Sequence, residues 1–519
     1  MSVALPLVEE IPPEWTPEAV FLRLVDAPHC LFLDSAMQHP HLGRYSFVAA
    51  DPLDYLEAAV DGPDGLTELA ARLSPFSGLA VPGLPPFQGG AAGLLGYELA
   101  HQWERLPTTR WNDFPMPVLA VGLYDVVVAF DHQQGRAWII SQGFPEQEPN
   151  RRLQRAQERL QEWKSRLGRP GPPQENRSSE GRILCGATQD FPGGIVPDVF
   201  WPERDVPRRG VGSAAGTLPG GPLAAVNSLL LPEELAPQYP VEGLRPLTSN
   251  FTPTGYQEAV RRVKEYICAG DVFQVNLSQR LLLPAQGPAW ELYLRLRVCH
   301  PAPFAGYFDL GRFQILSASP ERFLWVQGGQ VETRPIKGTR PRTGCTTKDR
   351  AAVQELLNSQ KDRAENVMIV DLLRNDLSRV CRPESIRVGQ LCGLESYSQV
   401  FHLVSAVRGQ LRPECSPIDL VRACFPGGSV TGAPKVRAME IIAELEPTAR
   451  GAYCGSLGYI GWNGNMDWNL LIRTITVGRG WVQLHVGGGV TILSDPEQEY
   501  QETWHKAQGL VQAMAGQTD

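Results

Sequence analysis

The stretch between residues 168 and 247 most constrains how this chain of 519 residues can fold. It opens with the run RPGPP at 169–173, and glycine, proline and serine recur through it without a sustained apolar period. A segment of this composition cannot present a continuous apolar face, so it is typical of a linker or an insertion. We therefore expect an N-terminal β-rich region over 1–167, a linker over 168–247 that is mobile in large part, and a C-terminal region over 248–519.

The N-terminal region carries strand patterns over about 30–60 and 85–145, separated by glycine and proline turns. Its clearest run, 118–130, is almost wholly apolar and predicts one buried strand. A helix is predicted from Asn150, as its cap, to about residue 167. The apolar stripe predicted for this helix consists of Leu153, Ala156, Leu160 and Trp163.

The C-terminal region alternates helix and strand patterns and contains no internal repeat. Helices are predicted over 256–269 and 347–373, near Pro434, and from Glu497 onward. Strands are predicted over 271–283, around 313–317 and 323–333, and over 455–462, 469–477 and 481–486. This pattern predicts a mixed α/β (α+β) fold, with large, mostly antiparallel sheets packed as a sandwich with surrounding helices.

Composition excludes several classes of protein. The net charge is -8 and no basic stripe is present, so we expect no nucleic-acid partner. No apolar run approaches the roughly 20 residues that span a bilayer, and the N-terminus lacks the pattern of a signal peptide. The ten cysteines contain no C-x-x-C pair. Reduced thiols and a cytoplasmic location are therefore expected.

Two pairs of acidic residues are candidates for a metal site. Asp362 and Glu365 are three residues apart in a predicted helix, and Glu499 and Glu502 repeat that spacing in the last helix, so each pair shares a helix face. Either pair alone also fits a solvated helix face. However, Glu365 lies in an apolar setting, where a buried carboxylate needs a partner or a metal. Carboxylates from two helices suit Mg²⁺ held jointly with an anionic substrate.

Three further segments are candidates for binding anions. The loop FPGGSVTGAPK at 425–435, with Ser429 near its centre, leads into a helix whose positive end favours a carboxylate or phosphate. An ordinary capped turn would look the same. The run Gly487, Gly488 and Gly489 lets a ligand approach the backbone closely. Arg473 lies among apolar residues of a strand, where bidentate binding of a carboxylate is its natural use.

Lys337 lies in the basic segment RPIKGTRPR at 334–342. Three arginines within five positions predict that crowded positive charge lowers the pKa of this amine, as a lysine nucleophile requires. Without further information, a basic surface turn is the simpler interpretation of the segment.

Taken together, these segments resemble the chorismate-binding superfamily, which includes component I of anthranilate synthase and of aminodeoxychorismate synthase, and the isochorismate and salicylate synthases. The resemblance is strong over about 256–511 and weaker over about 31–130. It rests on these motifs: SPERF at 319–323, PIKGTRPR at 335–342, DLLRNDL at 371–377, FPGGSVTGAPK at 425–435, ELEP at 444–447, RGAYCG at 450–455 and EYQET at 499–503, with GRYSF at 43–47 and FQGG at 87–90 in the weaker part.

The resemblance implies roles for individual residues. Glu365 and Glu502 correspond to Mg²⁺ ligands, with Asp362 and Glu499 beside them. Glu321 corresponds to the acid that assists loss of the ring hydroxyl. The implied binders of chorismate's carboxylates are Gly338, Thr339, Arg340, Tyr453, Arg473, Gly487, Gly488 and Gly489. His402 corresponds to a histidine beside the departing group, although a histidine in the core would be the simpler interpretation of that residue alone.

Two positions separate the reactions within the superfamily. Isochorismate and salicylate synthases use a lysine to activate water where this chain has Gln274, which cannot act as a base. Anthranilate synthases carry alanine where this chain has Lys337, the mark of aminodeoxychorismate synthases. The resemblance therefore implies amination of chorismate to 4-amino-4-deoxychorismate through a lysine-linked intermediate. Anthranilate synthase component I stays as the alternative, and a regulatory subunit without turnover is a further one.

The resemblance also implies partners. The chain lacks the Gly-x-Cys-x-Gly segment typical of glutamine amidotransferases, so a separate glutaminase subunit would supply ammonia. A downstream aminodeoxychorismate lyase would complete p-aminobenzoate for folate biosynthesis. Residues on two segments resemble the sides of the family's tryptophan pocket: Leu33, Ser35, Arg44, Tyr45 and Pro301. The family usually has asparagine before that proline, and His300 stands here.

Overall fold

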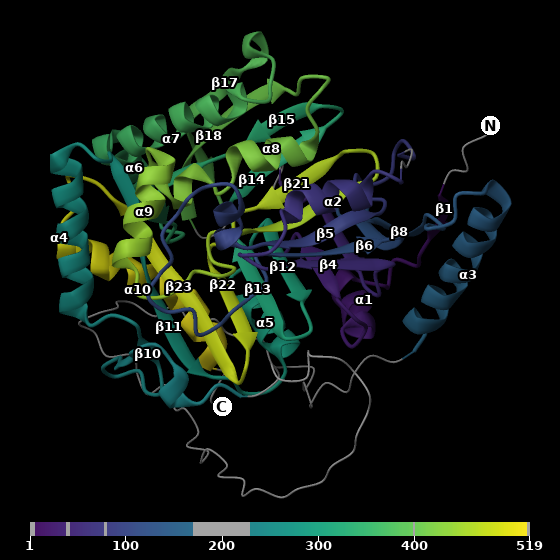
Figure 1. Cartoon of the computed structure of the whole chain (residues 1–519), viewed down its shortest axis with the longest axis horizontal. Helices are drawn as coiled ribbons and strands as arrows, with labels where there is room; N and C mark the ends of the chain where they lie inside the picture. The colour runs from purple at the N-terminus through teal and green to yellow at the C-terminus, as the bar shows by residue number, and fades with distance from the viewer. Residues whose placement is uncertain (1–5, 38–41, 77–79, 170–228, 398–399, 516–519) are drawn as a thin grey trace, which may run out of the picture.

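The computed structural model describes residues 6–37, 42–76, 80–169, 229–397 and 400–515 (Figure 1). Most of the segment predicted as a mobile linker, 170–228, lies outside the described residues. The last part of the predicted linker is described, and it contains a short 3₁₀ helix, η3 (Pro232–Glu234), and the two-residue strand β9 (Tyr239–Pro240). Within the described part of the chain, no helix is long and apolar enough to cross a membrane.

The larger of two antiparallel sheets contains thirteen strands in the described part of the chain. Their order is β1 (Leu7–Glu10), β8 (Arg136–Ser141), β7 (Val126–Asp131), β3 (Tyr45–Ala49), β2 (Leu31–Asp34), β12 (Phe304–Asp309), β13 (Phe313–Ser319), β22 (Thr474–Gly478), β23 (Trp481–Val490), β11 (Gln274–Pro284), β10 (Thr248–Ser249) and β9, with β19 (Gly432–Ala433) also paired to β11.

The smaller sheet contains ten strands in the same described ranges. Their order is β16 (Ile336–Pro341), β18 (Val400–Gln410), β15 (Gln330–Thr333), β14 (Arg322–Gln327), β21 (Met466–Asn469), β20 (Ser456–Gly461), β5 (Gly90–Leu95), β6 (Leu119–Tyr124) and β4 (Asp54–Ala58), with β17 (Arg387–Ser396) paired to β18. The predicted mixed fold with large antiparallel sheets is confirmed.

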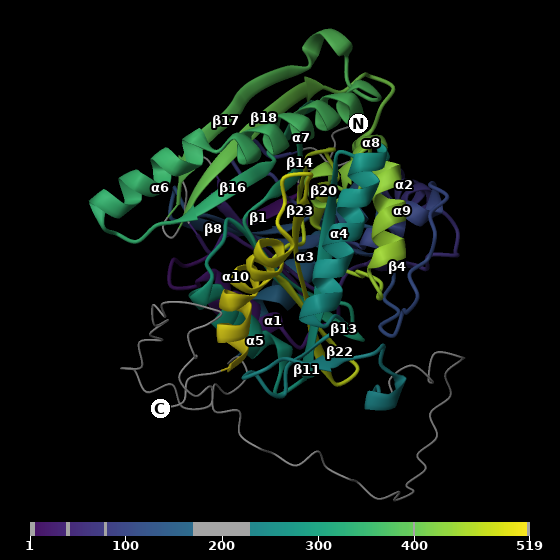
Figure 2. The same cartoon turned by 90° about the vertical axis from the view of Figure 1, so that its left-hand side faces the viewer.

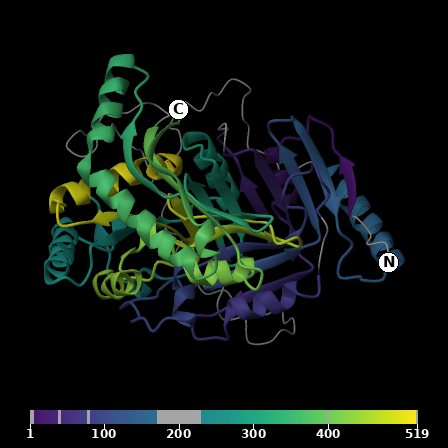
Figure 3. The ribbon, with the colours of Figure 1, turned by 90° about the horizontal axis from the view of Figure 1, so that it is seen from above.

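Helices cover the outer faces of both sheets (Figures 1 and 2). The α-helices are α1 (Pro17–Leu24), α2 (Gly65–Leu73), α3 (Pro149–Leu167), α4 (Pro253–Ala269), α5 (Ala289–Cys299), α6 (Thr346–Asn358), α7 (Gln360–Ser378), α8 (Pro417–Cys424), α9 (Lys435–Leu445) and α10 (Pro496–Ala515). Further 3₁₀ turns are η1 (Tyr97–Gln102), η4 (Pro383–Ser385) and η5 (Gly428–Val430). Seen from above, α6 and α7 run across the top of the molecule (Figure 3).

An apolar cluster between the two sheets makes the fold a sandwich. It combines residues of the larger sheet, such as Phe47 and Ile315, with residues of the smaller sheet, such as Leu94 and Leu457. A second cluster packs the larger sheet against α1, α3, α5 and α10, and a third packs the smaller sheet against α2, α7 and α8. Each fully buried large side chain in such a cluster contributes about 1.5–3 kcal/mol.

The two sequence regions on either side of the linker share both sheets. Strand β2 of the N-terminal region pairs with β12 of the C-terminal region in the larger sheet. Strand β5 pairs with β20 in the same way in the smaller sheet. The linker therefore separates two stretches of sequence whose strands lie side by side.

The apolar run 118–130 forms two strands in different sheets, so the prediction of one strand is wrong. Strand β6 pairs with β4 and β5, whereas β7 pairs with β3 and β8. Asp125 lies between them, is buried, and pairs with Arg159 of α3. Both strands are buried on both faces, so the run shows no alternation that would reveal the change of sheet.

Two helix predictions need correction. The predicted helix 347–373 is two helices, because Ser359 has extended backbone angles and its hydroxyl caps α7 by accepting from the amide of Asp362. The cap of α3 is Glu148 rather than Asn150, and Leu153 is exposed rather than part of the apolar stripe. A further strand prediction, 469–477, is interrupted between β21 and β22, where Arg473 adopts a left-handed backbone with φ of 51°.

Candidate functional site

Ser429 connects the two residues predicted to act as nucleophile and acid. The ammonium nitrogen of Lys337, on β16, donates to the backbone oxygen of Ser429 at 2.9 Å. The hydroxyl of the same serine donates to the Oε1 of Glu321 at 2.7 Å. The turn η5 therefore contacts both β16 and the loop after β13, although Ser429 lies 92 and 108 positions from Lys337 and Glu321 in the sequence.

Glu321 is the buried acid of this group, with 4% of its surface exposed. Burial raises the pKa of Glu321 to about 7, against the opposing effects of the Ser429 hydrogen bond and the charge of Lys337. The carboxyl group can therefore hold a proton near neutral pH, as a general acid must.

The positive charge predicted to crowd Lys337 is neutralised by partners, so that prediction needs correction. Each of the three neighbouring arginines binds a carboxylate, in the pairs Arg334–Glu395, Arg340–Glu355 and Arg342–Asp349. Lys337 itself lies near three carboxyl groups, and its positive charge acts to lower the pKa of each. They are those of Glu321, Glu365 and Glu502. The partners could not be read from the basic segment, because they come from other elements.

A bulge in β16 shapes the neighbouring part of the site. The register between β16 and β18 shifts between Lys337 and Thr339, and Gly338 has a positive φ of 77°. A Cβ atom at Gly338 would lie 3.0 Å from the side chain of Asp362 on α7, so both space and backbone favour glycine. Arg340 lies beyond the bulge, 3.5 Å from Asp362.

His402, on β18, lies beside the bulge. Its Nδ1 is 2.8 Å from the hydroxyl oxygen of Thr339. Burial, together with the charge of Arg473, lowers the pKa of His402 to about 3. The imidazole is therefore neutral near pH 7 and can donate one hydrogen bond and accept another without adding charge.

Arg473 has no carboxylate partner among the described residues. Burial lowers the pKa of its guanidinium. Its Nη1 lies 2.5 Å from the Nε2 of His300, which follows α5. A small hollow of about 40 Å³ lies against this group, and its lining includes His402 and Pro301. A cation in such a setting is suited to an anionic ligand. His300 as a partner of Arg473 was missed by sequence reasoning.

The four predicted metal-site carboxylates come from α7 and α10. Glu365 and Glu499 are buried, whereas Glu502 is about half exposed. Burial raises the pKa of Glu365, and the charges of Glu499 and Asp362 add to that effect. The helices therefore bring the two acidic pairs within electrostatic range of each other.

Lysines are the direct partners of two of these carboxylates. Lys361 donates to Glu499 at 2.9 Å, and Lys506 pairs with Glu502 at 2.7 Å and lowers the pKa of Glu502 to about 2. No group of three or more histidine, cysteine, aspartate or glutamate side chains already arranged to hold a metal ion occurs in the described ranges. Sequence reasoning missed both lysines, although the i, i+4 spacing of Glu502 and Lys506 signals their pairing.

The glycines of β23 leave space beside these carboxylates. A Cβ atom at Gly488 would lie 3.2 Å from Glu499 and 3.3 Å from Glu502. One at Gly489 would lie 3.4 Å from Glu365 and would clash with Gln274. At Gly487, by contrast, the nearest atoms belong to the paired strand β11.

Tyr453 and Gln274 complete the polar surroundings. Tyr453 is buried and stacks on His485, with ring centroids 5.2 Å apart. Gln274 is 1% exposed, and its Oε1 accepts no hydrogen bond in the structure. A buried amide oxygen without a donor is suited to a ligand or an ordered water.

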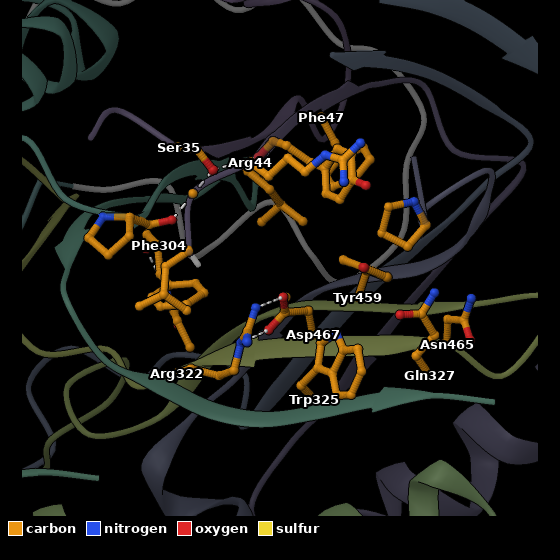
Figure 4. A pocket seen from close by; sticks show the side chains of 18 of the residues that line it. Ser35, Arg44, Phe47, Phe304, Arg322, Trp325, Gln327, Tyr459, Asn465 and Asp467 are labelled. Carbon is orange, nitrogen blue, oxygen red and sulfur yellow. Dashed lines mark hydrogen bonds and ion pairs between the residues drawn. The ribbon is translucent and has the colours of Figure 1, made fainter. Parts of the chain in front are cut away.

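Four of the five residues predicted for a tryptophan pocket line one cavity of about 400 Å³ between the sheets (Figure 4). They are Leu33, Ser35, Arg44 and Tyr45. The fifth, Pro301, lines the small hollow beside Arg473 instead. The charged groups of the cavity are paired within the protein: Arg44 with Asp131, Arg322 with Asp467, and Asp34 with Arg297.

Ser429 holds an amine and a buried acid, and the neighbouring residues supply neutral imidazoles and a guanidinium that has no carboxylate partner in the described residues. Such a set can bind a carboxylate, attack an electrophilic carbon and protonate a leaving oxygen. The two acidic helices lie within electrostatic reach of the same lysine.

Comparison of the sequence with known proteins finds a match to one family. The family described as chorismate binding enzyme matches residues 221–512. Aminodeoxychorismate synthase component 1 of Salmonella typhimurium is 34% identical over 534 residues, covering 99% of both chains. Anthranilate synthase component 1 of Thermus thermophilus is 35% identical, covering 96% of this chain and 95% of its own. The crystal structure of anthranilate synthase component I from Streptococcus pneumoniae TIGR4 has a TM-score of 0.68 at 26% identity, covering 91% and 93%.

Proposed function

Because this chain belongs to the family of chorismate binding enzymes, we propose that it is component 1 of an aminodeoxychorismate synthase, which aminates chorismate to 4-amino-4-deoxychorismate. Relatives with two different names are equally similar in sequence, so overall identity does not separate the two reactions. The observation that carries the proposal is the position of the Lys337 amine, joined through Ser429 to the acid Glu321.

This geometry supports a covalent route in two steps. In the first, the Lys337 ammonium loses a proton to water, and the resulting amine nitrogen bonds to C2 of chorismate as the C4–O bond breaks. Glu321 gives its proton to the departing hydroxyl, which leaves as water. The alkylated amine returns a proton to the Glu321 carboxylate. In the second, ammonia bonds to C4, the C2–N bond breaks, and the departing lysine takes up the proton that the new amine loses.

Arg473 and His402 position the substrate in this proposal. The guanidinium, which has no carboxylate partner in the described residues, binds a carboxylate of chorismate. His402, neutral because burial lowers the pKa of its ring, hydrogen-bonds near the departing group together with Thr339. The enolpyruvyl group keeps its bond to the ring, so a separate lyase completes p-aminobenzoate for folate synthesis.

We also propose that Glu365 and Glu502 hold a Mg²⁺ ion, with Asp362 and Glu499 beside them. The residues fit such an ion because oxygen ligands from two helices lie near Gly488 and Gly489, where the missing side chains leave space. When bound, the ion supplies positive charge for the ring carboxylate.

Replacing Glu365 or Glu502 by glutamine is expected to raise the Mg²⁺ concentration for half-maximal activity by about 10- to 100-fold. Activity titrated with Mg²⁺, and direct Mg²⁺ binding by calorimetry, measure the change. Glu497→Gln, an exposed residue of the same helix, serves as the matched control and is expected to titrate as the wild type does. Unchanged titrations for both Glu365→Gln and Glu502→Gln would remove the assigned ligands.

The ammonia for this reaction is proposed to come from a separate glutamine amidotransferase subunit. The chain lacks an amidotransferase nucleophile motif, and the name component 1 of its relatives supports a second subunit. The cysteines in the described part of the chain are all free thiols, which supports a cytoplasmic setting for the reaction.

Product analysis tests the proposed function. The purified chain is incubated with chorismate, ammonium and Mg²⁺, with and without an aminodeoxychorismate lyase. We expect p-aminobenzoate only when the lyase is present, because this chain leaves the enolpyruvyl group attached. Fluorescent 2-aminobenzoate appearing without the lyase would instead assign the chain to the anthranilate synthase reaction.

A further inference from the structure

His300 is held between the helix that carries two of the acidic residues and the arginine of the site. It directly follows α5, and the Nε2 of its ring lies 2.5 Å from the Nη1 of Arg473. On the other side, a Cβ atom at Gly509 of α10 would lie 3.4 Å from the ring atoms Cδ2 and Cγ. The glycine therefore leaves a surface on which the imidazole packs.

The protonation state of His300 follows from its partner. A guanidinium has only donors, so the Nε2 of His300 must be the acceptor and cannot carry a proton. Burial and the charge of Arg473 lower the pKa of His300 to about 3, which agrees with a neutral ring near pH 7. The contact is therefore a hydrogen bond from a cation to a neutral acceptor.

A neutral acceptor has a specific advantage at this position. A carboxylate in place of the ring would hold Arg473 more strongly, but it would neutralise the charge that a substrate carboxylate needs. An apolar residue would leave one N–H group of the guanidinium without a partner. An imidazole fixes the orientation of the guanidinium and preserves its charge.

The backbone of Arg473 is held by contacts other than those of its side chain. Arg473 adopts a positive φ of 51°, a left-handed conformation that is rare for a residue with a side chain. The amide of Ala318 donates to the backbone oxygen of Arg473 at 3.0 Å and holds the main chain in place. No carboxylate in the described residues holds the guanidinium, so its orientation depends on His300.

We propose that His300 is a positioning residue, whose neutral imidazole orients the guanidinium of Arg473 so that its remaining N–H groups face a carboxylate of the substrate. The proposal rests on the proposed function in taking that carboxylate to belong to chorismate. It assigns His300 no contact with the reacting atoms. Loss of His300 should therefore weaken chorismate binding and leave the chemical step nearly unchanged.

The matched pair His300→Gln and His300→Glu tests the proposal, because the two side chains have nearly the same shape, differ in charge and can place an oxygen where Nε2 lies. His300→Gln keeps a neutral acceptor and is expected to stay within about 3-fold of the wild-type KM for chorismate. His300→Glu neutralises Arg473 and is expected to raise KM by about 10- to 100-fold. The value of kcat at saturating chorismate is expected to change by less than about 3-fold in both.

Three further variants separate positioning from a structural role. His300→Leu removes the acceptor and is expected to raise KM by about 10-fold, whereas His505→Leu, at an exposed histidine of α10, should leave KM unchanged. In an Arg473→Gln background, His300→Leu should add no further increase in KM. Equal KM values for the glutamine and glutamate variants, or a full effect of His300→Leu without Arg473, would overturn the proposal.

The outcome stays separate from the test of the proposed function. Both the aminodeoxychorismate and the anthranilate reactions begin with chorismate, so KM can be measured with either product. If the wild type forms 2-aminobenzoate, the proposed function fails while the comparison of the His300 variants still decides this inference. If the product is as proposed and the two isosteric variants behave alike, only the inference fails.

Discussion

Replacing Lys337 by alanine is expected to lower the rate of 4-amino-4-deoxychorismate formation by about 10³-fold or more, with little change in stability. The side chain is partly exposed and its hydrogen bond goes to the backbone oxygen of Ser429, so its removal breaks no direct ion pair within the described residues. The expected loss is large because the variant lacks the atom that bonds to the ring in a covalent route. The measurement is a lyase-coupled assay of p-aminobenzoate.

Mass spectrometry of the quenched reaction provides the direct readout for Lys337. The wild type is expected to show a peptide containing Lys337 with the mass of the dehydrated substrate added, and the alanine variant to show none. Lys348→Ala, at an exposed lysine of α6, is the control and should keep full activity. An alanine variant with wild-type rates would exclude the covalent step, and any 2-aminobenzoate that it forms would indicate direct attack of ammonia at C2.

Replacing Glu321 by glutamine is expected to lower kcat by about 10²- to 10⁴-fold, the usual contribution of a general acid. Burial raises the pKa of Glu321 to about 7, so the carboxyl group is protonated below that pH and loses its proton above it. The wild-type kcat should therefore fall as pH rises through about 7. The glutamine variant cannot titrate at this position, and its residual activity should show no such limb.

Ser429→Ala tests whether Glu321 is the group that causes this fall of kcat with rising pH. The serine hydroxyl donates to Glu321 and acts to lower the pKa of its carboxyl group, so its removal should move the limb to higher pH. Lys337 binds the backbone oxygen of the same residue, which the substitution retains. Glu384→Gln, at an exposed site, should leave the pH profile unchanged. A limb that does not move in Ser429→Ala would mean that another group titrates.

Local features were readable from the sequence because they depend on spacing along the chain. The helix predicted over 256–269 is α4, which Gly270 ends in a left-handed conformation. The spacing of three between Asp362 and Glu365 is realised on α7. The run of glycines at 487–489 lies on a strand, as predicted. Periodicity and capping act over a few residues, so a single stretch of sequence contains the information.

Pairings between distant segments could not be read in this way. The sequence did not indicate that β6 and β7, which are consecutive, belong to different sheets, because buried strands on both sides of Asp125 look alike. It also did not indicate the partners of the three arginines near Lys337, since those carboxylates come from α6 and β17. Charge in a sequence is countable, but its neutralisation depends on what packs against it.

The sequence by itself determined which residue types carry the chemistry and which family motifs they form. Only the tertiary structure decided that Lys337 and Glu321 meet through Ser429, which lies 92 and 108 positions from them. It alone assigned His300 to Arg473, across 173 positions. The physical reason is that sheet packing and burial bring together groups with no common local period, and the pKa of Glu321 and the orientation of Arg473 depend on those contacts.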